Sequence, residues 1–347
     1  MANRSIGNEE KTRARELVKI YGQNSSSYLA LEDDKKLFFG KNTDGVIAYG
    51  IVGKVMVVCG DPICAPDDFN GMLAEFKQFC DENALHCVFM LTNGTFLGEY
   101  GAMGYNYVKA GEEALFSLNE YNIAGGKRKR MRRLVNNANS SLLTTHEYKP
   151  SERRCDEIEA GLLAVLNAWL AGKKSGQLQF SVGTLGLDEP LDKRYFYIKD
   201  DEGKIIAFNM FTPFAGMNGY LAEMTCRMPD APLGVTEKLT YDGFMVFKDE
   251  GMEWGSLGPA PLANIRKECE KANAAVKLLE FVYERCNRFF GFKNLYRAKK
   301  KYYPTEWIPK YFVYSAKTIT PRLAYAIVKI QNQGGVTDFL LSGLRWH

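Results

Sequence analysis

The stretch "NGYLAEMTCRMPDAPLGVTEKL", residues 218–239, decides the fold, because a predicted strand turns directly into a predicted helix there. Residues 220–227 are apolar enough for an internal strand, and the helix is predicted to run from about 235 to 250. Side chains of a strand alternate between its two faces. The pattern therefore predicts one face with Tyr220, Ala222, Met224 and Cys226, and an opposite face with Leu221, Glu223, Thr225 and Arg227.

Charged residues gather at this junction. Glu223 and Arg227 would share one face of the strand, while Asp230 would lie in the turn and Glu237 in the first turn of the helix. Because α/β proteins often bind ligands where strands end, the three carboxylates could hold a cationic group such as an ammonium, or accept a proton. Two plainer interpretations stay open: Glu223 and Arg227 form a buried structural pair, and Glu237 only stabilises the helix dipole.

The composition is that of a packed globular protein. The chain has 347 residues, of which 46% are hydrophobic and 25% charged. It contains no apolar run of about 18 residues, and its N-terminus lacks the apolar segment of a secretory signal, so we expect a cytosolic protein. The eight cysteines form no CxxC pair and there are only three histidines, so we expect buried thiols, no metal site and no cofactor.

Basic residues are concentrated in two short runs, although the net charge is only +4. The run 127–133, "KRKRMRR", contributes the candidates Lys127, Arg128, Arg130 and Arg132. The run 297–301, "RAKKK", contributes Arg297, Lys299 and Lys301 beside several aromatic residues, in a segment interpreted as closing strands. Such runs suit a polyanion, either RNA or an anionic membrane surface, although the first could also be a merely solvated helix.

The order of predicted elements occurs twice. The first half gives a hairpin, a helix, a strand, a short helix and two strands, at 45–62, 67–82, 85–91, 95–104 and 105–118. In the second half a helix leads into the same order, at 155–174, 194–214, 218–227, 235–250, 252–258, 264–290 and 294–315. We therefore predict two domains, 1–150 and 151–347, the second ending in an amphipathic tail that packs on the body or lies on a membrane.

The repeated unit, a mixed α/β sheet with a hairpin and crossover helices, resembles GCN5-related N-acetyltransferases. The resemblance implies a tandem pair of such domains. An acyl-CoA enzyme of this fold would hold its pyrophosphate at the junction with Arg/Gln-x-x-Gly-x-Gly/Ala. Here Asp230 and Pro232 occupy the two glycine positions, and Pro232 also removes an N–H that a phosphate would need. Acetyl-CoA is therefore not expected as the donor.

Several motifs together resemble the cytosolic C-terminal domain of the bacterial multiple peptide resistance factor, the aminoacyl-phosphatidylglycerol synthase family. They are "GDPI", "KRKRMRRLVNNAN", "RMPDAPLGVTEKL", "SLGPAPL" and "LYRAKKKYYPTEWIPKYFVY", and they lie between residues 20 and 325. The resemblance implies transfer of a lysyl or alanyl group from aminoacyl-tRNA to the hydroxyl of phosphatidylglycerol, by an enzyme peripheral to the inner face of the membrane.

That resemblance gives the candidate residues their expected roles. Glu223 or Asp230 would take the hydroxyl proton or hold the α-ammonium of the donor, and Arg227, Arg297 and Lys299 would stabilise an oxyanion or hold phosphate. Two alternatives remain open. One is tRNA-dependent aminoacyl transfer to a peptidoglycan precursor or another acceptor, and the other is a noncatalytic RNA-binding module.

Overall fold

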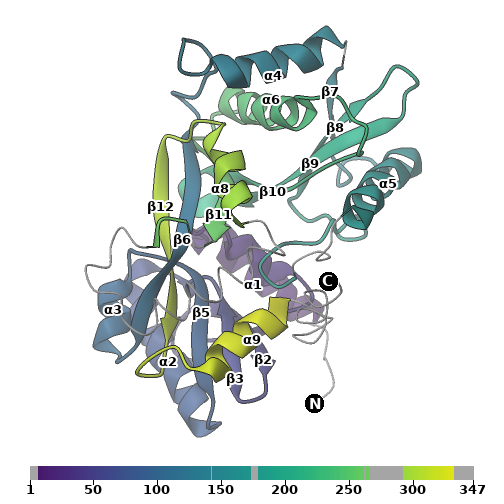
Figure 1. Ribbon diagram of the computed structural model, residues 1–347. Helices are drawn as coiled ribbons and strands as arrows, with labels where there is room; N and C mark the ends of the chain where they lie inside the picture. The colour runs from purple at the N-terminus through teal and green to yellow at the C-terminus, as the bar shows by residue number, and fades with distance from the viewer. Residues whose placement is uncertain (1–6, 142, 173–178, 262, 266–291, 332–347) are drawn as a thin grey trace, which may run out of the picture.

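A single mixed sheet runs through both halves of the chain. The computed structural model describes residues 7–141, 143–172, 179–261, 263–265 and 292–331. Its twelve-stranded sheet has the order β1-β2-β3-β5-β12-β6-β11-β10-β9-β8-β7, with β4 paired to β2. Figure 1 shows the N-terminal half at the bottom, the C-terminal half at the top right, and β6 and β12 between them. This confirms the predicted mixed α/β fold class.

The first unit begins with two helical segments and continues with the predicted hairpin. Its elements are α1 (Asn8–Tyr21), η1 (Ser27–Leu31), β1 (Lys36–Phe39), β2 (Gly45–Val52), β3 (Val55–Cys59), β4 (Ile63–Cys64), η2 (Pro66–Asp68), α2 (Phe69–Glu82), β5 (His86–Asn93), α3 (Leu97–Ala102) and β6 (Asn106–Ser117). Strands β2 and β3 are antiparallel, and α2 crosses over to place β5 parallel to β3. The region 105–118, predicted as two strands, contains the single strand β6.

The second unit follows the same order. Its elements are α4 (Lys129–Ser140), β7 (Thr145–Tyr148), α5 (Asp156–Ala171), β8 (Arg194–Lys199), β9 (Ile205–Phe214), η3 (Ala215–Met217), β10 (Gly219–Arg227), α6 (Val235–Asp249), β11 (Trp254–Pro261), α8 (Phe292–Lys300), β12 (Glu306–Tyr314) and α9 (Pro321–Gln331). Strands β9 and β10 are antiparallel, and α6 crosses over to place β11 parallel to β10. Most of the helix predicted at 264–290 lies outside the described residues.

The two units exchange their last strands. Strand β6, from the first unit, pairs with β11 of the second, and β12, from the second, pairs with β5 of the first. The two exchanged strands also pair with each other along their length, in an antiparallel arrangement. The division into two domains at residue 150 stays a prediction. Strands from before and after this residue are hydrogen-bonded to each other, so the sheet does not mark a boundary there.

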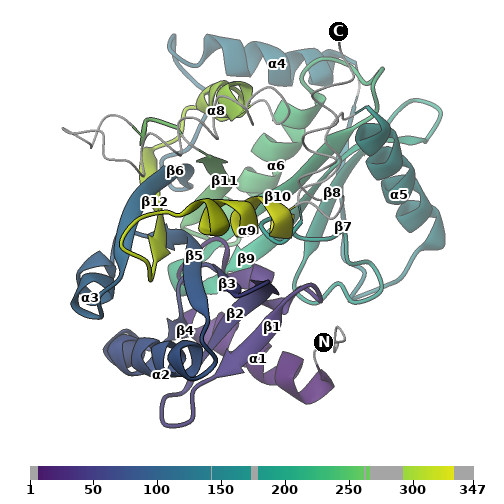
Figure 2. The ribbon, with the colours of Figure 1, turned by 60° about the horizontal axis from the view of Figure 1, so that its bottom comes forward.

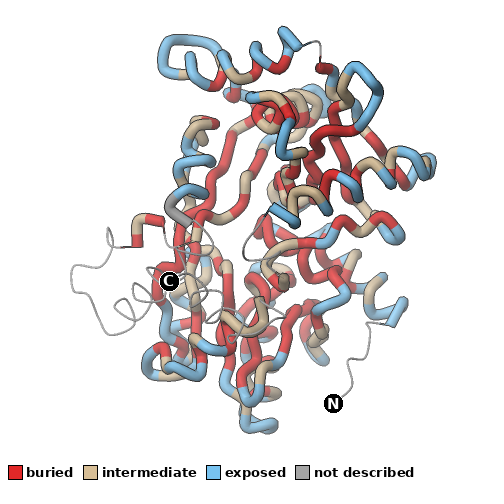
Figure 3. The backbone as a smooth tube through the Cα atoms, turned by 45° about the vertical axis from the view of Figure 1, so that its right-hand side comes forward, coloured by how far each residue is buried: buried red, intermediate tan, exposed pale blue. Residues whose placement is uncertain are grey.

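Helices cover both faces of the sheet and exclude water from it. Helices α4 and α6 pack on one face of the second unit and α5 on the other, while α2 and α9 cover opposite faces of the first unit (Figures 1 and 2). In Figure 3 the buried backbone follows the sheet from one unit into the other.

Within the C-terminal tail, Leu323, Ala326 and Ile327 of α9 are buried, so this part packs on the body. Among the described residues, no helix has both the length and the apolar character needed to cross a bilayer.

A buried ion pair lies in the middle of the exchanged strands. Lys310 on β12 and Glu113 on β6 are each 2% exposed, and their Nζ and Oε2 atoms are 2.7 Å apart. Lys310 also donates to the side-chain oxygens of Asn24, at 2.9 Å, and Asn93, at 2.6 Å. Removing one partner of such a pair leaves an unpaired buried charge, which costs about 3–5 kcal/mol. The pair therefore strongly favours the observed pairing of the two strands over a shifted one.

The segment between β10 and α6 packs directly on the backbone of α4. Gly234 has a left-handed conformation with φ of 97°, and a Cβ at that position would lie 1.9 Å from the carbonyl oxygen of Leu134. Asn137 on α4 also donates to the carbonyl of Leu233, at 3.3 Å. The start of α6, where an acyl-CoA enzyme would hold pyrophosphate, is thus in contact with the chain's own helix.

We predict that Gly234→Ala lowers the free energy of unfolding by at least about 3 kcal/mol, because it adds a backbone clash to the strain of a positive φ. Gly251→Ala is the matched control, since Gly251 has φ of 82° and open space around its Cβ position. That variant should lose only about 1–2 kcal/mol. Chemical denaturation of both variants measures the difference, and equal losses would mean that the contact with α4 contributes nothing.

Candidate active site

Glu223 lies at an irregular point of β10. The register with β9 shifts between Ala222 and Met224, so Glu223 is an extra residue in a β-bulge. Ala222 consequently packs in the core beneath α6, whereas Met224 and Cys226 pack in the core beneath α5. The predicted strict alternation along 220–227 is therefore wrong, because the bulge reverses the two faces at Glu223.

The Glu223 carboxylate accepts hydrogen bonds from neutral groups. The backbone N–H of Gly183 donates to Oε1 at 2.8 Å and the Thr212 hydroxyl donates to Oε2 at 3.1 Å. Burial raises the pKa of Glu223, and these two hydrogen bonds partly oppose that shift. A cation brought next to this carboxylate would favour its charged form, so the geometry suits an ammonium ligand.

Lys299, at the end of α8, is a buried amine with two carbonyl partners. Its Nζ donates to the carbonyl oxygens of Gly258, at 2.9 Å, and Pro259, at 2.6 Å. Burial lowers the pKa of Lys299 to about 7, although the carboxylates of Glu113 and Glu223 act in the opposite direction. An amine with this pKa is partly neutral near pH 7, and its lone pair is then able to accept a proton.

The carbonyl groups that hold Lys299 belong to a bulged part of β11. The pairing of β11 with β6 is irregular between Ser256 and Pro259, and Gly258 has φ of 73°. The Ser256 side chain fixes this loop, because its oxygen accepts from the Gly258 N–H at 2.8 Å and its hydroxyl donates to Glu113. The buried pair of Glu113 and Lys310 is thus connected to the position of Lys299.

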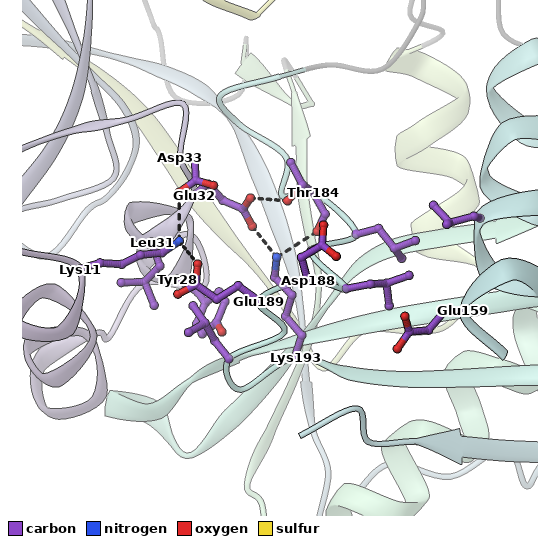
Figure 4. A pocket seen from close by; sticks show the side chains of 15 residues that line it. Lys11, Tyr28, Leu31, Glu32, Asp33, Glu159, Thr184, Asp188, Glu189 and Lys193 are labelled. Atoms are coloured by element: carbon purple, nitrogen blue, oxygen red, sulfur yellow. Dashed lines mark hydrogen bonds and ion pairs between the residues drawn. The ribbon is translucent and has the colours of Figure 1, made fainter. Parts of the chain in front are cut away.

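A cavity of about 470 Å³ lies between η1, α5 and the loop before β8 (Figure 4), and this loop connects it to Glu223, which does not itself line it. The loop before β8 contacts both Glu223 and the cavity. The N–H of Gly183 donates to Glu223, and the hydroxyl of the neighbouring Thr184 donates to Glu32 at 2.6 Å. Lys193 also pairs with Glu32, at 2.8 Å. The charged lining residues are five carboxylates and two lysines: Glu32, Asp33, Glu159, Asp188 and Glu189, with Lys11 and Lys193. Arg154, outside the lining, also pairs with Glu159, and the remaining surplus of negative charge suits a cationic ligand.

The other carboxylates predicted at the junction do not share this environment. Asp230 is exposed in the turn after β10. Glu237 is buried at the start of α6 and forms an ion pair with Lys301. Burial would raise the pKa of Glu237, but Lys301 lowers it below its ordinary value. Arg227 is half-buried and donates to the Ala231 carbonyl at 2.9 Å, which fixes the turn. These contacts indicate a structural contribution of Glu237, Lys301 and Arg227.

The two basic runs are helical. The run 127–133 leads into α4, and its exposed residues are Lys127, which lies before the helix, and Lys129, Arg130 and Arg133 on it. Arg128 and Arg132 are half-buried and donate to groups of the loop 122–125. The segment 294–300, predicted as part of the closing strands, belongs to helix α8 (Phe292–Lys300), and the strand β12 begins only at Glu306. Arg297 is exposed on α8, whereas Lys299 reaches the interior.

Residues that the sequence did not single out support the site. Glu32 and Lys193, which are 161 positions apart, meet at the cavity. Asp61, in the "GDPI" motif, accepts from Asn24 at 3.1 Å and from the Asn93 N–H at 2.9 Å. Asn24 and Asn93 are also the partners of Lys310. No signal local to these residues predicts such pairs.

In the described part of the chain, no three His, Cys, Asp or Glu side chains are arranged for a metal ion.

Several solved structures have the same fold. The structure of L-PGS from Bacillus licheniformis has a TM-score of 0.79 and 25% identity, covering 99% of this chain and 98% of that one. The C-terminal domain of a putative lysylphosphatidylglycerol synthetase from Agrobacterium fabrum has a TM-score of 0.76 and 24% identity, covering 91% and 93%. FemX, at a TM-score of 0.53, 11% identity and coverage of 94% and 98%, shares the fold alone.

Curated relatives include several phosphatidylglycerol lysyltransferases. The phosphatidylglycerol lysyltransferase of Staphylococcus haemolyticus is 26% identical over 322 residues, which is 93% of this chain and 37% of that protein. The phosphatidylglycerol lysyltransferase of Bacillus subtilis is 27% identical over 295 residues, 84% of this chain and 34% of that protein. The chain thus spans about a third of the length of these relatives. Since the model of the family described as "Phosphatidylglycerol lysyltransferase, C-terminal" matches residues 15–314, the chain belongs to that family, as its motifs predicted.

Proposed function

We propose that this chain is an aminoacyltransferase that moves a lysyl group from aminoacyl-tRNA to a glycerol hydroxyl of phosphatidylglycerol. The observation that carries the proposal is that a half-buried carboxylate, Glu223, lies close enough to Lys299 for its charge to act on that amine, whose pKa burial lowers to about 7. The names of the curated relatives support both the lipid acceptor and the lysyl group. We further propose that the enzyme works as a peripheral protein on the inner face of the membrane.

Glu223 is proposed to hold the α-ammonium of the donor. The hydrogen-bond partners of this carboxylate are neutral, so a cationic ligand would compensate for its burial. The neighbouring cavity has five carboxylates against two lysines and the Arg154 partner of Glu159, and the remaining negative charge favours a lysyl side chain over the methyl group of alanine. Asp230 is exposed and is assigned no contact with the donor.

Lys299 is proposed to act as the general base, a role different from the phosphate contact predicted from its sequence context. A neutral amine has two N–H bonds, and the carbonyl groups of Gly258 and Pro259 accept both of them. The lone pair is then the part of the amine left to receive the hydroxyl proton. The tRNA ester is already activated, so positioning of its carbonyl supplies much of the remaining rate.

The reaction then proceeds by direct attack. The lipid hydroxyl oxygen bonds to the ester carbonyl carbon as Lys299 takes the hydroxyl proton. The bond from that carbon to the ribose oxygen breaks, and the ammonium of Lys299 returns the proton to the leaving oxygen. Arg297, exposed on α8, and the cations before and on α4 are proposed to contact phosphate groups of the tRNA or the lipid.

Labelled lysyl-tRNA and phosphatidylglycerol vesicles test the proposed function directly. We expect labelled lysyl-phosphatidylglycerol, and less product from alanyl-tRNA. Label in a peptidoglycan precursor instead would favour the cell-wall acceptor. Binding of the tRNA without a product on any acceptor would favour a noncatalytic RNA-binding protein, and either result contradicts the proposal.

Glu223→Gln is expected to lower kcat/KM for transfer by roughly 10–100-fold, because a neutral amide replaces the charged partner of the α-ammonium. The affinity for tRNA should change little, since the phosphates bind elsewhere. Glu253→Gln is the matched control, because Glu253 is exposed and lies outside the site. Transfer by Glu223→Gln at the rate of this control would remove Glu223 from the mechanism.

The pH dependence of transfer should report the titration of Lys299. The protonated amine cannot accept a proton, so kcat/KM should rise as the pH increases through about 7. Lys299→Arg keeps a cation that does not deprotonate, and should lower the rate about 10²–10⁴-fold and remove this rise. Lys300→Met, which changes the exposed neighbour, should retain it. An unaltered pH profile in Lys299→Arg would show that another group is the base.

A further inference from the structure

An exposed leucine is held rigidly between β10 and α6. Leu233 is 68% exposed, the largest fraction for a large apolar side chain among the residues that the structure describes. The backbone on both sides is fixed: Ala231 accepts from Arg227 at 2.9 Å, and Gly234 is pressed against the Leu134 carbonyl. Pro232 further restricts the segment. Leu233 therefore stays in water because of the local architecture and not because the loop is loose.

Helix α4 places cations alongside this leucine. Asn137 donates to the Leu233 carbonyl, so the face of α4 that carries Asn137 borders the loop. Residues three, four and seven positions apart share one face of a helix, and Arg133 and Arg130 precede Asn137 by four and seven positions. Both arginines are exposed. Figure 1 shows α4 and α6 side by side at one end of the molecule.

The neighbourhood has a clear excess of positive charge. Besides the two arginines, Lys127 and Lys129 are exposed at the start of α4, whereas Asp230 is the exposed carboxylate in the loop itself. Arg128 and Arg132 are bonded to the preceding loop. The surface thus combines a fixed apolar side chain with a cationic border.

We infer that Leu233, Arg130 and Arg133 form a docking surface for an anionic lipid bilayer, with Leu233 inserted among the acyl chains and the arginines on lipid phosphates. An apolar side chain surrounded by cations matches the boundary between acyl chains and anionic headgroups. The phosphates of RNA would bind the arginines, but RNA would gain little from contact with an isolated leucine. Its bases stack instead on aromatic rings and planar guanidinium groups. The inference extends the proposed function, because it names the surface by which the enzyme reaches its lipid acceptor.

Vesicle sedimentation tests the surface without any need for turnover. Vesicles of phosphatidylglycerol mixed with phosphatidylcholine should bind the chain, and vesicles of phosphatidylcholine alone should bind it weakly. Leu233→Ser should weaken binding to the mixed vesicles about tenfold, and Arg130→Gln with Arg133→Gln about 20-fold at low salt. Ile20→Ser is the matched control, because Ile20 is 63% exposed on α1, and it should bind like the unaltered chain. Circular dichroism melting checks that each variant is folded.

Soluble short-chain phosphatidylglycerol separates docking from catalysis. Leu233→Ser should transfer to this monomeric acceptor at the unaltered rate but transfer poorly to vesicles. Vesicle binding by Leu233→Ser equal to that of the unaltered chain would overturn the inference, and so would a double arginine variant that loses RNA binding but keeps vesicle binding. A chain that binds vesicles in the expected pattern but transfers no amino acid would contradict the proposed function and leave the docking surface intact.

Discussion

The ion pair between Lys310 and Glu113 connects the strand exchange to the candidate site. It is buried where β12 and β6 run antiparallel, at the point where each unit donates a strand to the other. Glu113 accepts from Ser256, Ser256 fixes the bulge at Gly258, and the carbonyl of Gly258 holds Lys299. A buried charge pair tolerates little displacement, because either member alone is costly in the interior. The position of the amine proposed as the base thus depends on the correct pairing of strands from both halves.

The duplicated element order could be predicted because the apolar periodicity records which faces are buried. In α2, Phe69, Met72, Leu73 and Phe76 are all buried, as their helical spacing indicates. The strand exchange could not be predicted in this way. The apolar periodicity of a strand does not say which strands lie alongside it, so the sequence of β12 carries no sign that it inserts beside β5.

Two local errors had physical causes. The bulge at Glu223 adds one residue without any glycine or proline to mark it, and one added residue reverses every later side chain. The segment 294–300, predicted as part of the closing strands, lies instead in helix α8. Tyr296 and Lys299 are half-buried there while their neighbours are exposed, which is a helical spacing of three. Lys299 was identified from its motif, but its lowered pKa arises from burial that only the fold provides.

The continuous sheet also limits how the molecule can move. Two domains joined by a linker open and close about a hinge, and many enzymes with a site between domains admit substrate in that way. Here the backbone ladders of β6 with β11 and of β12 with β5 would have to break before the halves could separate. Any ligand that reaches the candidate site near this seam therefore meets a continuous sheet, and the parts that can move to admit it are side chains and connecting segments.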